Sequence, residues 1–462
     1  MGAMPRSVMG STIVALATPT GVGGIAVIRV SGVTALKVAM KLTGKPIQSF
    51  KPRLAVHCPL LNKDQVEIDI GIVTYFKGPN SYTGEDIIEI SCHGGYVLPG
   101  RIINSCMKAG CVPAAPGEFT KRAFLNGKID LSQAEAVAEI ISSKSELSQD
   151  ISYKYLSGKF SNLINNMKDS LLSIITLIEA ELDFSTDEIS TTPNKTKIRM
   201  IDKVIEKGNA LISTYSTGRL LKEGAIVTIT GNPNVGKSSL LNAIISEDRV
   251  IVTDIPGTTR DAIEVFYKIN GLPVRFVDTA GIRDSNDKIE IRGVEISREF
   301  IDRSDLVLWV FDVGFSLEEI ENQISDPFFD APFIPVLNKT DLLEPRDNTS
   351  YCSTNSLPHI YNTSALKGMG IKELIKRVYN TLVSDTLITE PEMLLTNSRH
   401  RDAIEKCLEA ITETKVLLVE NIESDLIASR LRDGLFELDK ILGITTADDI
   451  LENIFSKFCV GK

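Results

Sequence analysis

Residues 231–238 read GNPNVGKS, and this run constrains the fold more than any other part of the chain. It has the G-x-x-x-x-G-K-S form of a phosphate-binding loop, in which glycines let the backbone wrap a triphosphate and the next helix points its N-terminus at the anion. The apolar run 225–230 predicts a buried strand before the loop, and the run from Ser239 predicts a helix after it. Lys237 is expected to reach the outer phosphates, and Ser238 to place its hydroxyl on Mg²⁺.

Two later motifs indicate which base the site reads. Asp278-Thr-Ala-Gly281 follows the apolar run 274–277, so Asp278 is expected at a strand end, facing Mg²⁺ through water, with Gly281 offering its N–H to the γ-phosphate. Asn338-Lys-Thr-Asp341 follows the run 333–337. A carboxylate such as Asp341 accepts hydrogen bonds from the N1–H and 2-amino group of guanine, which adenine lacks. The order of the motifs predicts GTP as the ligand.

The stretch 363–366 is expected to complete the guanine pocket, and the stretch 253–261 to form the first switch loop, with Thr259 as a second Mg²⁺ ligand. The predicted nucleotide contacts are Asn234, Val235, Gly236, Lys237, Ser238, Ser239, Thr253, Asp254, Ile255, Pro256, Gly257, Thr258, Thr259, Asp278, Thr279, Ala280, Gly281, Asn338, Lys339, Asp341, Ser364, Ala365 and Leu366.

Hydrolysis needs a device other than the usual glutamine, because Ile282 stands where Ras-like GTPases carry the glutamine that orients water. The chain either hydrolyses GTP poorly or uses another group. The amide oxygen of Asn234, together with backbone carbonyls of the first switch loop, suits a monovalent cation, and K⁺ there can neutralise developing charge as an arginine finger does. Glu290 is the candidate for positioning the attacking water; the alternative is a solvated acid of the loop.

Composition limits the partners and the compartment. A formal net charge of −10 argues against a broad grip on nucleic acid, which needs clustered Lys and Arg, so RNA contact is expected to be local or shared. The seven cysteines show no paired metal-binding spacing and are expected to be reduced thiols. No apolar run reaches the ~18 residues that cross a bilayer, and no signal peptide or lipidation motif is found. A cytoplasmic protein without a membrane anchor is expected.

The chain is expected to divide into an α+β N-terminal domain over 1–119, a helical domain in two parts over 120–220 and 381–462, and an inserted GTPase domain over 221–380. The fold class is multidomain α/β and α, with a helical bundle and a Ras-like phosphate-loop domain whose sheet is mostly parallel. Asp130-Leu-Ser-Gln133 is a variant capping box that begins a helix. The stripe Leu163, Met167, Leu171, Ile174, Ile178 and Leu182 indicates a bundle core.

Several runs outside the phosphate loop resemble one family. They are residues 17–32 (ATPTGVGGIAVIRVSG), 78–86 (GPNSYTGED), 116–128 (PGEFTKRAFLNGK) and the terminal 458–462 (FCVGK). Together they resemble the MnmE (TrmE) family of bacterial tRNA-modification GTPases over nearly the whole chain from about Ser11.

The resemblance implies a homodimer whose N-terminal domains pair and are similar to tetrahydrofolate-binding domains. It implies a flavin (FAD)-dependent partner, MnmG, which joins it in a heterotetramer or larger complex and modifies C5 of the wobble uridine of certain tRNAs. By position, Arg29, Glu89, Lys128 and Lys462 are implied to contact 5-formyl- or methylene-tetrahydrofolate. An Arg or Glu in a strand is also commonly part of a surface ion pair, and that alternative stays open.

The same resemblance implies that Asn234, Thr253, Ile255 and Thr258 hold K⁺, that Ser238 and Thr259 hold Mg²⁺, and that Glu290 orients the water. Cys459 lies in the terminal motif. A thiolate beside a lysine can act as a nucleophile, or the tail can simply pack over the folate site.

Two other functional hypotheses remain. The chain could be a regulatory GTPase switch for RNA–protein assembly that carries out no one-carbon chemistry. It could also transfer one-carbon units to a small metabolite, with GTP as a regulator.

Overall fold

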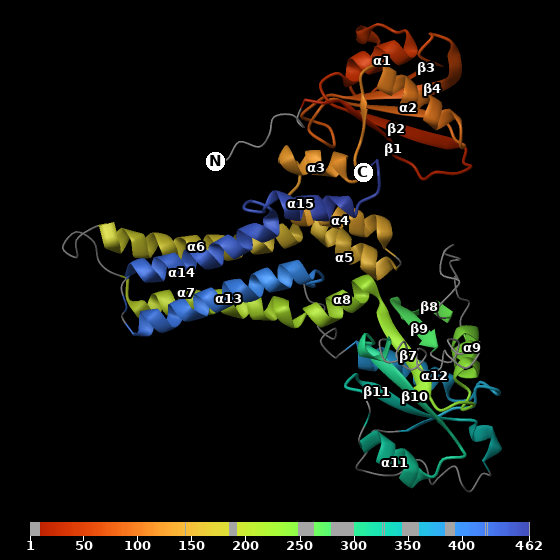
Figure 1. Cartoon of the computed structure of the whole chain (residues 1–462). Helices are drawn as coiled ribbons and strands as arrows, with labels where there is room; N and C mark the ends of the chain where they lie inside the picture. Colours follow the sequence, from red (N-terminus) through yellow and green to blue (C-terminus); the bar gives the residue numbers. More distant parts are fainter. Residues whose placement is uncertain are drawn as a thin grey trace. The chain divides into compact units, whose positions relative to one another are not determined.

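The computed structural model describes residues 10–143, 145–183, 192–247, 263–278, 300–325, 327, 329–343, 360–383, 393–420, 422 and 424–461. By their contacts, residues group into two compact units. One unit consists of Met1–Ser142, Ser152–Ile205 and Ala403–Lys462, and the other of Ser143–Ile151 and Glu206–Asp402. Figure 1 shows an α+β part, a set of long helices and an α/β part, which confirms the predicted fold class.

The N-terminal part of the first unit is a six-stranded sheet in the order β3-β4-β5-β2-β1-β6. Its strands pair antiparallel, except that β6 runs parallel to β1. The elements are β1 (Ile13–Leu16), β2 (Ile25–Ser31), α1 (Ala35–Thr43), a 3₁₀ turn (Ile47–Ser49), β3 (Ala55–Leu61), β4 (Glu67–Phe76), β5 (Ile87–His93), α2 (Leu98–Lys108), β6 (Val112–Pro113) and α3 (Glu118–Leu125).

Alternation along β2 sorts its side chains between the two faces of this sheet. Ala26, Ile28 and Val30 are buried in a core that also holds residues of α1 and α2. Arg29 belongs to the opposite face, where its guanidinium lies over the ring of Phe119 on α3. One face of the sheet therefore carries the larger core, and the other presents Arg29 beside a smaller buried cluster that includes Phe119.

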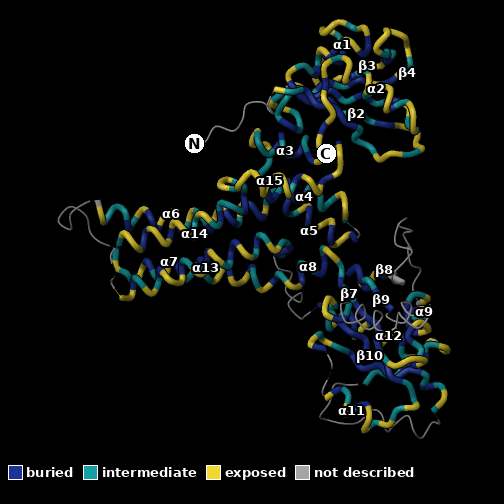
Figure 2. Tube along the Cα trace, viewed as in Figure 1, coloured by how far each residue is buried: buried dark blue, intermediate teal, exposed yellow. Residues whose placement is uncertain are grey.

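The helices of the first unit include α4 (Leu131–Ser142), α6 (Lys159–Asp183), α14 (Ser424–Leu442) and α15 (Asp448–Ser456), together with most of α7 (Asn194–Ser213) and α13 (Ser398–Val419). Helix α5 (Glu146–Leu156) is divided between the two units. Burial follows the inward faces of these helices (Figure 2). Met167, Leu171, Ile174 and Ile178 are buried as predicted. The prediction is wrong at the two ends of the stripe, where Ile164 rather than Leu163 is buried and Leu182 lies 43% exposed.

The α/β part of the second unit has the strand order β12-β11-β10-β7-β9-β8. Neighbouring strands run parallel except β8, which pairs antiparallel with β9. Its elements are α8 (Tyr215–Glu223), β7 (Ala225–Gly231), α9 (Lys237–Glu247), β8 (Ile263–Ile269), β9 (Leu272–Asp278), β10 (Leu306–Asp312), α11 (Leu317–Ser325), β11 (Phe333–Asn338), a 3₁₀ turn (Thr340–Leu342), β12 (Tyr361–Asn362) and α12 (Ile371–Leu382).

Four of the parallel strands, β7, β9, β10 and β11, are nearly continuous apolar runs because both of their faces are covered. Their carboxyl ends lie at one edge of the sheet, where ligands bind in open α/β sheets. This edge carries Gly231, Asp278, Asp312 and Asn338.

Candidate functional site

The phosphate loop lies between β7 and α9. Gly231 has φ +144° and lies so close to β10 that a Cβ there would meet the Val310 carbonyl oxygen at 2.1 Å. Asn234 has φ +65° and Gly236 has φ +93°, so the loop turns back on itself in the left-handed region. The Lys237 ammonium donates 2.9 Å hydrogen bonds to the carbonyl oxygens of Gly231 and Asn232. The ammonium therefore lies over the loop.

Ser238 and Asp278 come together from two elements. The register of the parallel pair places Asp278 of β9 beside Ile229 of β7. The Ser238 hydroxyl donates a 2.6 Å hydrogen bond to Asp278 Oδ2, and Asp278 is fully buried while Ser238 is exposed. A hydroxyl next to a carboxylate is the oxygen donor set that Mg²⁺ prefers, so these residues fit the predicted ion.

The base-reading loops meet the phosphate loop through Asn338. Its side-chain N–H donates to the Val235 carbonyl oxygen at 3.0 Å, and its Oδ1 accepts from the Ala365 N–H at 3.1 Å. The side chain of Val235 is itself buried, so only its backbone faces the site. Asn338 therefore joins the loops that follow β7, β11 and β12.

Asp341 lies beside Ser364 in the same group of loops. The Ser364 hydroxyl donates a 2.6 Å hydrogen bond to Asp341 Oδ1 and lowers the pKa of the Asp341 carboxyl below its ordinary value. The group is therefore held ionised, as an acceptor for two N–H donors of a base must be. Leu366 is exposed, and Ser239 is exposed at the start of α9.

The remaining predicted residues of the nucleotide site lie outside the described part of the chain. They are Thr253, Asp254, Ile255, Pro256, Gly257, Thr258, Thr259, Thr279, Ala280, Gly281 and Glu290. Lys462 of the predicted folate site also lies outside it. The roles of these residues stay predictions.

Sequence reasoning missed Asp312, which ends β10 as Asp278 ends β9. Asp312 Oδ2 accepts a 2.8 Å hydrogen bond from the Lys339 ammonium. The signal that could have found Asp312 is an acidic residue directly after an apolar run, which is the signal that singled out Asp278.

In the first unit, the structure brings Arg29 and Glu89 together, directly opposite each other on β2 and β5. Arg29 Nη2 and Nε lie 2.8 and 2.9 Å from Glu89 Oε1. The guanidinium also lies 5.5 Å from the ring centre of Tyr82, and the pair stays 16% and 29% exposed. A partly buried charge pair beside aromatic rings can present both a donor and an acceptor to a flat heterocycle. Lys128 is exposed on the loop after α3.

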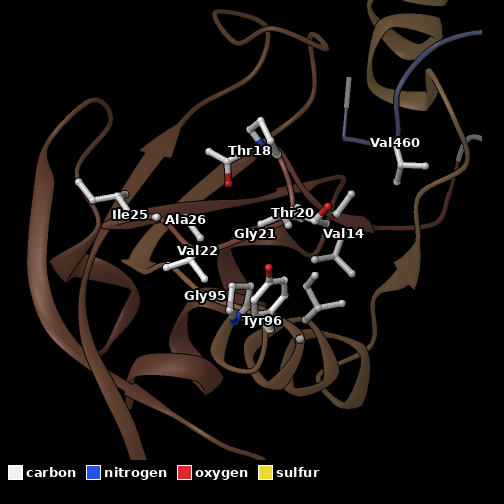
Figure 3. A pocket seen from close by; sticks show the side chains of 18 of the residues that line it. Val14, Thr18, Thr20, Gly21, Val22, Ile25, Ala26, Gly95, Tyr96 and Val460 are labelled. Carbon is white, nitrogen blue, oxygen red and sulfur yellow. The ribbon is translucent and has the colours of Figure 1, made fainter. Parts of the chain in front are cut away.

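A cavity of about 650 Å³ opens in the same domain (Figure 3). Its lining includes Leu16 of β1, Tyr96, Ile103 of α2 and Val460 of the C-terminal segment, but not Arg29 or Glu89. Thr18, Thr20 and Tyr96 supply hydroxyls to a mostly apolar wall.

The C-terminal segment lies against β1. Gly461 has φ +96°, and a Cβ there would meet the Leu16 carbonyl oxygen at 2.1 Å. The Gly117 N–H donates to the Cys459 carbonyl oxygen at 3.4 Å. The terminal motif is therefore brought to the sheet that carries Arg29. Cys459 is exposed, whereas the thiols of Cys58, Cys92, Cys106, Cys111 and Cys407 are free and buried.

Sequence reasoning also missed an ionic network around Arg122 of α3. The buried Arg122 guanidinium bridges Glu85 and Glu118, at 3.0 and 2.8 Å, and donates to the Ser11 carbonyl oxygen at 2.8 Å. Because Arg122 has partners for its charge on several sides, we assign it to the packing of α3 on the domain.

The strand, loop and helix around Lys237, with Asp278 and Asn338 at the same sheet edge, define a protein with a phosphate-loop GTPase fold. Two family profiles match the chain: the GTP-binding protein TrmE N-terminus over residues 12–128, and the MnmE helical domain over residues 131–459. The chain belongs to the MnmE family.

Curated relatives match over the full length. The tRNA modification GTPase MnmE of Clostridioides difficile is 39% identical over 98% of this chain and 99% of its own length. The proteins of the same name from Carboxydothermus hydrogenoformans and Aquifex aeolicus are each 40% identical, over 98% of this chain and 100% of their own length. Among the described residues, no helix is long and apolar enough to cross a membrane.

Proposed function

We propose that this chain is a GTP hydrolase that acts in tRNA modification and is activated by K⁺. The observation that carries the proposal is the meeting of phosphate-binding and base-reading groups at one sheet edge: Lys237 on the loop, Ser238 on Asp278, and Asn338 joining both loops to the base side. The full-length relatives are named tRNA modification GTPases. We place the domains at 1–119, 120–220 with 381–462, and 221–380.

In this proposal each group acts on a defined part of the nucleotide. The Lys237 ammonium and the amides of the loop hold the phosphates, and Ser238 and Thr259 hold Mg²⁺, which shields the phosphate charge. Asp341 accepts from the guanine N1–H and 2-amino group, and Ser364 keeps its carboxylate ionised. Ala365 and Leu366 complete the pocket.

Hydrolysis is proposed to depend on K⁺ held by Asn234, Thr253, Ile255 and Thr258, with Glu290 positioning the water. Bound K⁺ supplies positive charge beside the β- and γ-phosphates. The exposed amide of Asn234, on a residue fixed at φ +65°, is a neutral oxygen donor of the kind that suits a monovalent cation.

We propose that the N-terminal domain binds a reduced folate through Arg29, Glu89, Lys128 and Lys462, and pairs with a second copy. The flavoprotein MnmG is the proposed partner for modifying C5 of the wobble uridine. The partly buried Arg29–Glu89 pair and the approach of the terminal segment to β1 support this proposal. GTP hydrolysis would then drive a rearrangement of the domains.

The main test of nucleotide function is hydrolysis in two salts. We expect K⁺ to stimulate turnover and Na⁺ not to, and Asn234→Ala to remove the stimulation while GTP still binds. Equal rates in the two salts would reject the role of the cation. No heat on titration with a GTP analogue in potassium buffer would reject the nucleotide site itself.

A regulatory switch without one-carbon chemistry is the alternative, and folate binding separates the two hypotheses. Titration with 5-formyl-tetrahydrofolate should show saturable binding that Glu89→Ala removes with dimerisation intact. A protein that ignores the folate but still hydrolyses GTP would favour the switch. Modification of the wobble uridine in cells lacking the chain tests the biological assignment.

A further inference from the structure

Asp312 makes two hydrogen bonds at the carboxyl end of β10. Its Oδ1 accepts from the Gly314 N–H at 3.0 Å, which fixes the carboxylate relative to its own turn. Its Oδ2 accepts from the Lys339 ammonium at 2.8 Å. The parallel register sets Asp312 beside Asn338, so Lys339 is the next residue along the neighbouring strand end. The sheet itself brings this pair together.

Lys339 connects this carboxylate to the phosphate loop. The same ammonium donates a 2.6 Å hydrogen bond to the Asn234 carbonyl oxygen. Lys339 and Asn234 both have left-handed backbones, at φ +64° and +65°. Residues other than glycine adopt this conformation at a cost in free energy and keep it where surrounding contacts hold it. The Asp312–Lys339–Asn234 chain of contacts is one such restraint.

The pair differs from an ordinary surface ion pair in what it joins. A surface pair contributes little because water screens it and both side chains move. Here the carboxylate is also bonded to a backbone N–H, and the ammonium to a backbone carbonyl, so three separate loops share one set of contacts. Burial of Asp312 acts to raise its pKa, but the bonds from Lys339 and Gly314 outweigh it and leave the pKa below its ordinary value.

We propose that Asp312 is a positioning residue for guanine-nucleotide binding, which acts by holding Lys339 on the phosphate loop. This inference rests on the proposed nucleotide site. Without the carboxylate, the ammonium loses its counter-charge, and the Asn234 carbonyl loses a fixed donor. The phosphate loop must then be ordered at the expense of binding free energy. The affinities for GTP and for GDP should therefore fall together. Turnover at saturating GTP and K⁺ should change little.

The first test is calorimetric titration of the full chain with GDP and with a non-hydrolysable GTP analogue in potassium buffer. For Asp312→Asn, loss of a charge-assisted hydrogen bond should raise both Kd values about tenfold, with kcat within about twofold of the wild type and KM raised. Asp330→Asn is the matched control, because Asp330 is exposed in the loop before β11 of the same domain. Its Kd and KM should equal those of the wild type.

The decisive test is a double-mutant cycle. In a Lys339→Ala background, Asp312→Asn should have no further effect on Kd, because its only route to the nucleotide is gone. An equal fold-change in both backgrounds would overturn the inference, as would an unchanged Kd in the single variant. If Asp312→Asn does not fold, Asp312→Ser, which also lacks the carboxylate, provides the measurement, and wild-type affinity in that variant would overturn the inference. A wild-type chain that binds no guanine nucleotide would instead overturn the proposed function.

Discussion

Asp341 carries the base specificity proposed for the nucleotide site, and its neighbour Ser364 keeps the Asp341 carboxylate ionised. The 2.6 Å hydrogen bond from Ser364 stabilises the carboxylate and lowers its pKa, so the group stays ionised throughout the range in which the protein would work. Specificity at this point depends on hydrogen-bond polarity, which a single substitution can reverse.

Asp341→Asn should exchange guanine for xanthine. An asparagine presents an N–H₂ group that cannot accept from the guanine 2-amino group, whereas xanthine has a carbonyl oxygen at that position. We expect GTP affinity to fall about a hundredfold, as for sites that lose a hydrogen bond built to read a substrate, and XTP to bind better than GTP. Competition binding measures both, and unchanged preference for GTP would contradict the role of Asp341.

At the scale of elements, short strands and their ends were predictable because each is encoded locally. Strands β7, β9 and β11 confirm the strands predicted from apolar runs, to within one or two residues. Helix α9, however, begins at Lys237 rather than Ser239, since the last residues of the phosphate-loop motif already form its first turn. Asp312–Lys339 and Gly461–Leu16 could not be predicted, because they join residues far apart in the chain.

The capping box that begins α4 is formed as predicted. The Gln133 N–H donates to Asp130 Oδ1 at 3.0 Å, and the Asp130 N–H donates to Gln133 Oε1 at 3.0 Å. Asp130→Ala should lower the free energy of unfolding by about 1 kcal/mol, the usual cost of a lost N-cap. Urea unfolding followed by circular dichroism measures this. Glu409→Ala, at an exposed position inside α13, is the control that should leave stability nearly unchanged.

Because Cys407 on α13 is buried, the free energy of unfolding should depend on pH in the alkaline range. Burial, and then Glu437, raise the pKa of this thiol from 9.0 to about 12. Above pH 9 the unfolded chain loses a proton that the folded chain retains, so stability falls as pH rises, by up to about 1.4 kcal/mol per pH unit for this group. Cys407→Ala should be less stable than the wild type at pH 8, and this deficit should shrink by pH 10. A constant deficit in urea unfolding would contradict this assignment.

At the scale of the whole molecule, the terminal segment returns to the first strand. Gly461 packs against the Leu16 backbone, and Val460 lines the cavity beside it. The terminal motif, which the family resemblance links to folate, is thereby delivered to the domain that carries Arg29 and Glu89. Because the C-terminal segment meets β1 there, folate binding should depend on this contact, and GTP hydrolysis should not.

Gly461→Ala tests that dependence directly. Its φ of +96° disfavours a side chain, and the new Cβ would lie 2.1 Å from the Leu16 carbonyl oxygen, so the tail must shift. We expect affinity for 5-formyl-tetrahydrofolate to fall about tenfold, comparable to losing one charge-assisted contact from the displaced Lys462, with kcat for GTP unchanged. Gly110→Ala is the matched control for Gly461→Ala. Its φ of +117° brings similar backbone strain, but a Cβ there meets nothing within 4 Å. If both variants bind folate equally well, the tail packs on the sheet without serving the ligand. If Cys459→Ser also keeps full affinity while Gly461→Ala loses it, the tail serves the ligand through its placement and not through the thiol.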